Sequence, residues 1–152
     1  FAARSIERSY LALVWGLPRP AEGTITGNIG RSPRNRKKMA VLRRGGRPAE
    51  TGYRVLKSFH NGLVSLVECR LKTGRTHQIR VHMHHKGAPL LGDPIYGRPA
   101  RNPALPDRLM LHAWRLSFDH PITGVRHFFE APIPPEFEPW TSQVTLPARS
   151  LA

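Results

Sequence analysis

Residues 71–97 constrain the fold of this chain more than any other stretch. They begin at the end of an extended run, turn at Thr73-Gly74, and then have the pattern of a helix from Thr76 to Lys86. Gly87 suits the left-handed position that commonly ends a helix, and the proline two residues later cannot continue one. The sequence therefore predicts one central helix, followed by a rigid loop over residues 89–97.

The predicted helix would place three polar side chains on one face. His77, Arg80 and His84 are spaced three and four residues apart, so they become neighbours on a helix. Arg75 would lie in the first turn, where the helix dipole disfavours a cation. A cation is favourable there if a phosphate or carboxylate binds beside the free backbone N–H groups. The pattern thus predicts an anion-binding helix start.

Most of the remaining chain has the pattern of short strands. Apolar or alternating runs are separated by glycine and proline, and Asn61-Gly62 is a strong hairpin signal between two of them. The predicted strands cover residues 10–15, 24–29, 39–42, 50–58, 64–71, 109–118 and 125–131. Together with the single long helix, they predict an α+β fold. Its expected form is a mixed, largely antiparallel sheet with one central helix and short peripheral helices.

The length allows one domain with a core, or part of one. We expect residues 1–140 to form this unit. The polar residues 141–152 show no periodic pattern and are expected to be a poorly ordered tail. The three tryptophans are expected in the core or at its edge; they are Trp15, Trp114 and Trp140.

The single cysteine, Cys69, excludes an internal disulfide and fits a reducing compartment, so we expect a cytoplasmic protein. Cys69 lies in an alternating run and is expected to be an ordinary buried thiol. No apolar run approaches the roughly 20 residues that a membrane-spanning helix requires.

Charge is the strongest feature of the composition. The chain has 24 Lys and Arg against 10 Asp and Glu, a formal charge of +14. Such a domain implies a polyanionic partner, most simply a nucleic acid. Arginine also favours bidentate contacts with phosphate and stacking on bases.

The positive charge is concentrated between residues 31 and 47. This basic segment has eight basic residues, no acidic one, and glycines and prolines that indicate a flexible hairpin around the short strand 39–42. With Arg75 and His77, it supplies the candidate nucleic-acid-binding residues. These are Arg31, Arg34, Arg36, Lys37, Lys38, Arg43, Arg44, Arg75 and His77.

Several motifs resemble one family closely. The run Thr-Gly-Arg-Thr-His-Gln-Ile-Arg-Val-His at 73–82 and Gly-Asp-Pro-Ile-Tyr-Gly at 92–97 are similar to signatures of the RluA-type pseudouridine synthases. Residues 8–16 resemble the tyrosine strand of that family, and residues 112–135 resemble its closing strands. The resemblance extends from the first residue to about Trp140.

The resemblance implies that the chain is the C-terminal portion of a catalytic domain that isomerises uridine in structured RNA without a metal or cofactor. Ribosomal RNA is the commonest substrate class of the family, and transfer RNA is second. Tyr10 matches the tyrosine that lies against the flipped base. Arg80 matches the arginine that pairs with the catalytic aspartate. Both are expected to converge on one cleft.

The family's nucleophile is an aspartate in an Arg-Leu-Asp block upstream of the tyrosine strand. The three aspartates of this chain, Asp93, Asp107 and Asp119, lie outside any such block. We therefore expect the nucleophile in a missing N-terminal part of the same protein, and the isolated chain to be inactive. The sheet should look incomplete, and Arg80 should lack its carboxylate partner.

The same residues bear on two other classes of function. The net charge and the absent nucleophile also fit a non-catalytic basic RNA-binding module, which would have no reason to bury Arg80 facing an empty acidic position. A metal site is disfavoured, because His77, His82, His84 and His85 do not follow zinc-ligand spacing. Structural hydrogen bonds are expected for His77 and His82 instead.

Overall fold

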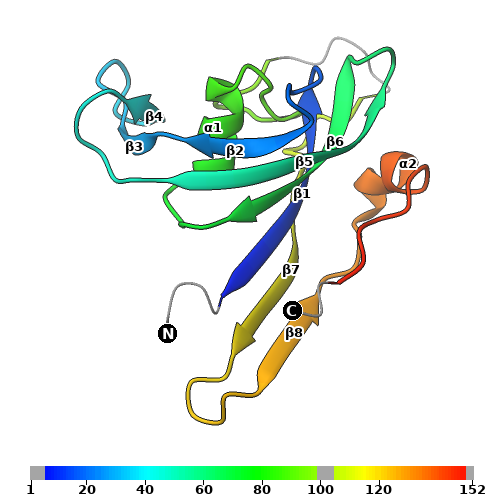
Figure 1. The fold of residues 1–152 in the computed structure, drawn as a ribbon. Helices are drawn as coiled ribbons and strands as arrows, with labels where there is room; N and C mark the ends of the chain where they lie inside the picture. Colours follow the sequence, from blue (N-terminus) through cyan, green and yellow to red (C-terminus); the bar gives the residue numbers. More distant parts are fainter. Residues whose placement is uncertain (1–5, 99–104, 150–152) are drawn as a thin grey trace.

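The computed structural model describes residues 6–98 and 105–149, which form a six-stranded sheet, a separate two-stranded sheet and short helices (Figure 1). The strand order in the large sheet is β2-β5-β6-β1-β7-β8, and each pairing is antiparallel. The elements in chain order are β1 (Glu7–Trp15), β2 (Glu22–Thr26), β3 (Asn28–Arg31), β4 (Met39–Leu42), β5 (Glu50–Phe59), β6 (Val64–Leu71), α1 (Gln78–His85), β7 (Leu111–Asp119), β8 (Arg126–Glu130), the 3₁₀ turn η2 (Pro135–Phe137) and α2 (Glu138–Thr141). The predicted α+β class is confirmed.

The two faces of the sheet have different covers. On the α1 face, Ala12 of β1 and Cys69 of β6 pack with Ile79 and Met83 of α1. The opposite face, here called the α2 face, packs against η2 and α2 in a core cluster that contains all three tryptophans. Alternate residues of each strand supply the two clusters, as the pleat of a strand requires. The described helices are too short to span a membrane.

The α1 helix starts two residues later than predicted. His77 occupies the N-cap with a left-handed backbone (φ 56°, ψ 26°), and the helix begins at Gln78. The reason is the buried side chain of Gln78, whose Oε1 accepts hydrogen bonds from the backbone N–H of Arg75 (3.0 Å) and the hydroxyl of Thr73 (2.7 Å). These bonds hold residues 73–77 in a turn. Arg75 therefore lies outside the helix, so the expectation that it places a cation in the first turn is wrong.

The helix ends as expected. Gly87 has a left-handed φ of 89°, and the backbone N–H groups of residues 87 and 88 bond back to carbonyls of the last turn. The hairpin between β5 and β6 is also confirmed, with left-handed conformations at His60, Asn61 and Gly62. The predicted strand 24–29 is wrong in one respect, because Gly27 divides it into β2 and β3. A Cβ at Gly27 would lie 2.8 Å from Val41 Cγ1, so the hairpin can approach only a glycine.

The outer strands of the large sheet are β2 and β8, and neither pairs with a further strand within residues 6–98 and 105–149. Residues 141–152 were expected to be a poorly ordered tail, and some of them contact the domain. Val144 and Leu146 pack against the tryptophan cluster, and Arg115 donates to the carbonyl of Pro147 (2.7 Å). The tail through Arg149 therefore lies against the domain, because its two apolar side chains add to the core; residues 150–152 lie outside the described residues.

Candidate active site

Arg80 of α1 is held by a carboxylate from the loop that follows the helix. Its Nε and Nη2 donate to Oδ2 and Oδ1 of Asp93, both at 2.8 Å, and the two side chains are only 13% and 0% exposed. The expectation that Arg80 would lack a carboxylate partner is therefore wrong. A tight loop causes the difference. At Gly92 (φ 72°) an added Cβ would overlap the carbonyl of Arg108, so only glycine lets the loop turn Asp93 towards the helix.

The Arg80–Asp93 pair is charged in both members. Burial alone would raise the pKa of Asp93, but hydrogen bonds from Arg80 and from the N–H groups of Tyr96 and Ile95 outweigh it and hold this pKa below its ordinary value. The pKa of Arg80 is raised, chiefly by its hydrogen bond to Asp93. Since both Asp93 oxygens are engaged and its side chain has no exposure, Asp93 is unsuited to attack a substrate.

The polar residues of the 73–82 motif form one continuous hydrogen-bond chain. The Gln78 amide donates to the Glu50 carbonyl (2.9 Å) and to the Thr51 hydroxyl (3.0 Å). Thr51 lies 2.8 Å from His82 Nδ1, and His82 Nε2 lies 3.1 Å from the carbonyl of Gly27. A carbonyl only accepts, so Nε2 carries the proton and Nδ1 accepts from Thr51. Burial lowers the pKa of His82, which fits this neutral ring.

His77, the other histidine of the motif, bonds to the loop after the helix. Its Nδ1 lies 2.9 Å from the hydroxyl of Tyr96, and the two rings meet edge to face. Burial, followed by the charge of Arg80, lowers the pKa of His77, so the ring is neutral at pH 7. The structural hydrogen bonds predicted for His77 and His82 are thus confirmed. The roles of Gln78, Asp93 and Tyr96 were missed, although each belongs to a motif already noted in the sequence.

Tyr10 lies in β1, next to a β-bulge that follows Ser9. Its side chain is half-buried and packs against the cluster that contains Ile79 and Met83 of α1. Tyr10 is therefore on the same face of the sheet as the helix that carries Arg80. Beside it is a pocket of about 260 Å³. The pocket is lined by Arg8, Ser9, Tyr10, Ala113, Trp114, Arg115, Leu116, Phe129 and Ala131, so Arg80 is not among its lining residues. The convergence of Tyr10 and Arg80 on one cleft stays a prediction.

The basic segment covers the last residue of β3, the turn to β4, β4 itself and the turn after it, on the α1 side of the molecule (Figure 1). The turn between the two strands is shaped by its own hydrogen bonds. Ser32 Oγ accepts from two backbone N–H groups, and Arg31 Nη1 donates to the carbonyl of Arg36 (2.9 Å). Six of the seven candidate RNA-binding side chains on this segment are exposed; they are Arg31, Arg34, Arg36, Lys37, Arg43 and Arg44.

The remaining candidate RNA-binding residues lie close to that hairpin. Arg75 Nε donates to the carbonyl of Pro48 at the end of the basic segment (2.8 Å). His77 reaches the hairpin through Tyr96, whose hydroxyl accepts from the N–H of Met39 (2.9 Å). Residues from three separate parts of the sequence are thus brought together on one side of the structure.

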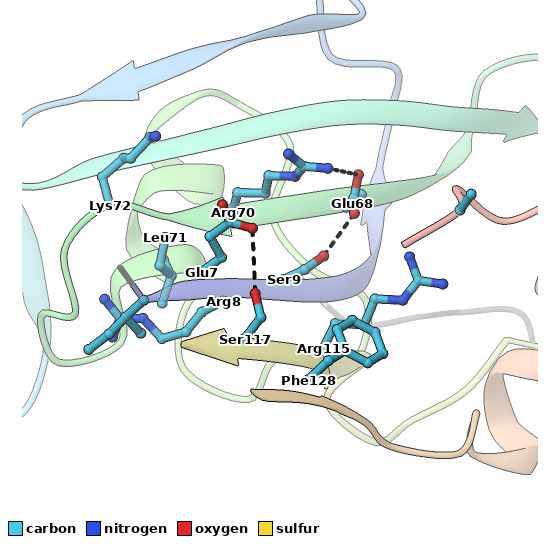
Figure 2. A pocket seen from close by; sticks show the side chains of 12 residues that line it. Glu7, Arg8, Ser9, Glu68, Arg70, Leu71, Lys72, Arg115, Ser117 and Phe128 are labelled. Carbon is cyan, nitrogen blue, oxygen red and sulfur yellow. Dashed lines mark hydrogen bonds and ion pairs between the residues drawn. The ribbon is translucent and has the colours of Figure 1, made fainter. Parts of the chain in front are cut away.

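A second pocket, of about 340 Å³, lies on the opposite face of the sheet near the start of β1 (Figure 2). Its floor includes the buried carboxylate of Glu68, which accepts from Ser9 Oγ (2.8 Å) and pairs with Arg54 (3.4 Å) and Arg70 (3.7 Å). No motif in the sequence indicated this site, because strand pairing alone brings Ser9 opposite Arg70 and beside Glu68.

Comparison with known proteins agrees with the motifs. Residues 1–85 match the family model described as RNA pseudouridylate synthase. "Ribosomal large subunit pseudouridine synthase D" of Neisseria meningitidis is 48% identical over 141 residues, covering 86% of this chain and 37% of that protein. An uncharacterized RNA pseudouridine synthase of Chloroflexus aurantiacus is 49% identical over 136 residues, covering 90% and 42%. The chain spans less than half the length of these relatives.

The fold is shared with solved structures. Human RNA Pseudouridylate Synthase Domain Containing 1 superposes with a TM-score of 0.71 at 33% sequence identity, covering 86% of this chain and 56% of that one. Human RNA Pseudouridylate Synthase Domain Containing 4 gives 0.67 at 27% identity, covering 88% and 60%. The matched family model covers more than half of the 152 residues, and the fold and RluA-type motifs agree with it, so the chain belongs to the RNA pseudouridylate synthase family.

Proposed function

We propose that this chain is the C-terminal part of an RNA pseudouridine synthase that isomerises uridine in large-subunit ribosomal RNA, with Tyr10 and Arg80 in its active site. The observation that carries the proposal is the placement of Tyr10 against the core cluster that includes Ile79 and Met83 of α1, on the face of the sheet that this helix covers. The relatives named as acting on the large ribosomal subunit support the choice of RNA.

The reaction breaks the bond between C1′ of the ribose and N1 of uracil and forms one between C1′ and C5. The proton at C5 is lost, and N1 gains a proton. The reaction has no net oxidation or reduction. The carboxylate nucleophile that the family uses comes, in this proposal, from a part of the protein that precedes the present chain. Arg80 pairs with that carboxylate and keeps it ionised and aimed.

The Asp93 contact suits Arg80 to this role. Asp93 engages Nε and Nη2, and among the described residues Nη1 of Arg80 makes no hydrogen bond. A guanidinium has five N–H donors in a fixed plane, so it accommodates a second carboxylate while the first holds it still. Asp93 is thus proposed to position Arg80, and Nη1 to meet the nucleophile.

Tyr10 and the basic segment bind different parts of the RNA. Taking the target base out of its stack costs a few kcal/mol. The exposed arginines and lysines of the basic segment offset that cost by binding phosphates, and Tyr10 lies against the extruded base. Since the segment is beside α1, RNA held there lies on the same side of the molecule as Arg80.

The catalytic assignment is tested in the complete protein by measuring pseudouridine in a ribosomal RNA transcript by mass spectrometry. Arg80→Ala is expected to lower turnover at least 100-fold, roughly the effect of a lost charged contact in the transition state, with a small change in RNA affinity. Arg54→Ala is the matched control, because Arg54 also pairs with a buried carboxylate, Glu68. Equal losses of turnover in the two variants would remove Arg80 from the mechanism.

The binding assignment is tested by the salt dependence of RNA affinity. Replacing Arg34, Arg36, Lys37 and Arg43 by Gln should flatten the plot of log affinity against log salt by roughly 3 units, since each phosphate contact contributes somewhat under one. The control replaces four exposed basic residues elsewhere, namely Arg19, Lys57, Lys86 and Arg149. An unchanged slope in the first variant would place the RNA path elsewhere.

A non-catalytic RNA-binding role is the second candidate for the isolated chain. Asp93 is engaged by Arg80, and Asp119 pairs with Arg126 at 3.1 Å, which favours a chain without its own nucleophile. The feature expected to argue against a pure binder, a buried arginine facing an empty acidic position, is not found. We expect residues 1–152 to bind RNA and form no pseudouridine; detection of pseudouridine would contradict both this role and the missing nucleophile.

A further inference from the structure

Tyr96 contacts both members of the Arg80–Asp93 pair and also bonds to the β3–β4 hairpin and to His77. It is 6% exposed and lies in the loop after α1. Its ring lies 5.2 Å from the guanidinium carbon of Arg80, and its N–H donates to Asp93 Oδ1 (3.1 Å). At the other end, its hydroxyl bonds to the N–H of Met39 in β4 and to Nδ1 of His77, both at 2.9 Å.

The polarity of the hydroxyl contacts follows from their chemistry. The Met39 N–H can only donate, so the tyrosine oxygen accepts there. The phenolic proton then points to Nδ1 of His77, which accepts it in the neutral ring. One hydroxyl therefore connects the β3–β4 hairpin to His77, the N-cap residue of α1, and the ring of the same tyrosine contacts Arg80.

The β3–β4 hairpin is held in position by its contacts with α1 and with the loop that follows α1. A two-stranded hairpin is marginally stable by itself in water. Here β3 and β4 are anchored by a small cluster in which Ile29 packs with Ala49, Val81 and Tyr96, with Met39 at its edge. In that cluster Tyr96 also bonds to the backbone of β4 through its hydroxyl. The Met39–Tyr96 hydrogen bond thus connects β4 directly to the ring that contacts Arg80.

We propose that Tyr96 is a positioning residue that couples RNA binding on the basic β3–β4 hairpin to the orientation of Arg80. Phosphates bound by the exposed arginines restrain β4, the Met39–Tyr96 bond transmits that restraint, and the ring and backbone of Tyr96 act on Arg80 and Asp93. This inference deepens the proposed function and rests on it for the role of Arg80.

The first test uses the 152-residue chain without RNA. Tyr96→Phe keeps the ring and removes the hydroxyl, so the Met39 amide should exchange its hydrogen about fivefold faster or more, the effect of losing one ordinary hydrogen bond. Tyr53→Phe is the matched control, because Tyr53 is equally buried and its hydroxyl bonds to the Pro20 carbonyl instead (2.6 Å). Unchanged Met39 exchange in Tyr96→Phe would overturn the proposal.

The second test follows the Arg80 Nε–H signal by nuclear magnetic resonance while a ribosomal RNA stem–loop is added. The signal should shift in the wild-type chain and in Tyr53→Phe. In Tyr96→Phe the shift should fall to a third or less while RNA still binds. A purely structural tyrosine would leave the RNA response of Arg80 intact. Equal shifts in all three proteins, or no shift in wild type despite binding, would overturn the coupling.

The two tests separate this inference from the proposed function. If the chain binds no RNA, the proposed function fails and the coupling fails with it, whereas the Met39 exchange still decides whether the hydroxyl anchors the hairpin. If RNA binds and only the Arg80 response is unaffected by Tyr96→Phe, the proposed function survives and the coupling does not.

Discussion

The α1 region and the β7–β8 hairpin use their polar and apolar side chains in opposite ways. Around α1, the polar side chains of Thr51, Gln78 and His82 are buried and hydrogen-bonded. On the β7–β8 hairpin, large apolar side chains are exposed, with Phe129 at 55% and Ile122 at 88%. Figure 1 shows this hairpin extending away from α1.

The buried polar side chains of the 73–82 motif have a structural role. Gln78 joins the start of α1 to β5, and His77 joins it through Tyr96 to the β3–β4 hairpin. Arg80 is a charged side chain of the motif, and Asp93 holds it in a defined orientation. The β7–β8 hairpin is held by its strand pairing and by a row of rings, Phe118, His127 and Phe129. Substitutions should therefore be costly in the first region and mild in the second.

The largest difference is expected for arginine. Arg80→Ala leaves the Asp93 carboxylate buried without its partner, which should lower the free energy of unfolding by about 3–5 kcal/mol. Arg126→Ala, at the end of β8, removes contacts with the exposed Asp119 and Glu7 and should cost about 1 kcal/mol or less. Urea denaturation of the 152-residue chain measures both, and similar losses would remove the distinction between the regions.

A smaller loss is expected for the amide that joins the motif to β5. Gln78→Met keeps the size of the side chain but leaves Arg75 N–H and the Thr73 hydroxyl without their acceptor, so it should cost about 2–3 kcal/mol. Gln143→Met changes an exposed amide in the tail and should stay within about 0.5 kcal/mol. Thermal unfolding measures the stability of both variants. If Gln78→Met were as stable as Gln143→Met, the hydrogen-bond network around Gln78 would be dispensable for folding.

The histidine of the network predicts a pH dependence. Burial lowers the pKa of His82 in the folded state, so below the ordinary value of 6.5 the unfolded chain binds more protons than the folded one. Stability should therefore fall as the pH drops below that value, by at most about 1.4 kcal/mol per pH unit for this group. His82→Gln should be less stable at pH 7 and show a shallower decline. If the stability of His82→Gln falls with pH as steeply as that of the wild type, the pH dependence comes from other titratable groups.

The smallest effect is expected on the exposed face of the β7–β8 hairpin. Phe129→Thr keeps a residue that favours strands and removes mostly exposed surface, so the change should be about 0.5 kcal/mol or less. Phe137→Ala, in the fully buried core beneath α2, should cost about 3–5 kcal/mol. A large loss from Phe129→Thr in urea denaturation would show that the row of rings supports the hairpin.

Much of the fold could be predicted because its signals are local. Asn61-Gly62 and the alternating runs beside it lead directly to the β5–β6 hairpin, and Gly87 ends α1 as expected. The start of α1 could not be placed in this way. It depends on the side chain of Gln78, which accepts hydrogen bonds from Thr73 and Arg75 in the turn before the helix and itself donates to Thr51, 27 residues earlier. Helix periodicity contains no information about these side-chain contacts.

The sequence by itself determined the family, the strand pattern, the positive charge and the identities of Tyr10 and Arg80 as candidate site residues. Only the tertiary structure decided what Arg80 contacts. Its partner Asp93 is separated from it by the whole second half of α1 and a tight glycine turn, and it reaches the guanidinium only because the loop folds back on the helix. The link from the basic hairpin through Tyr96 is of the same kind. Residues 39 and 96 meet through packing of separate elements, and motif spacing along the chain does not encode that distance.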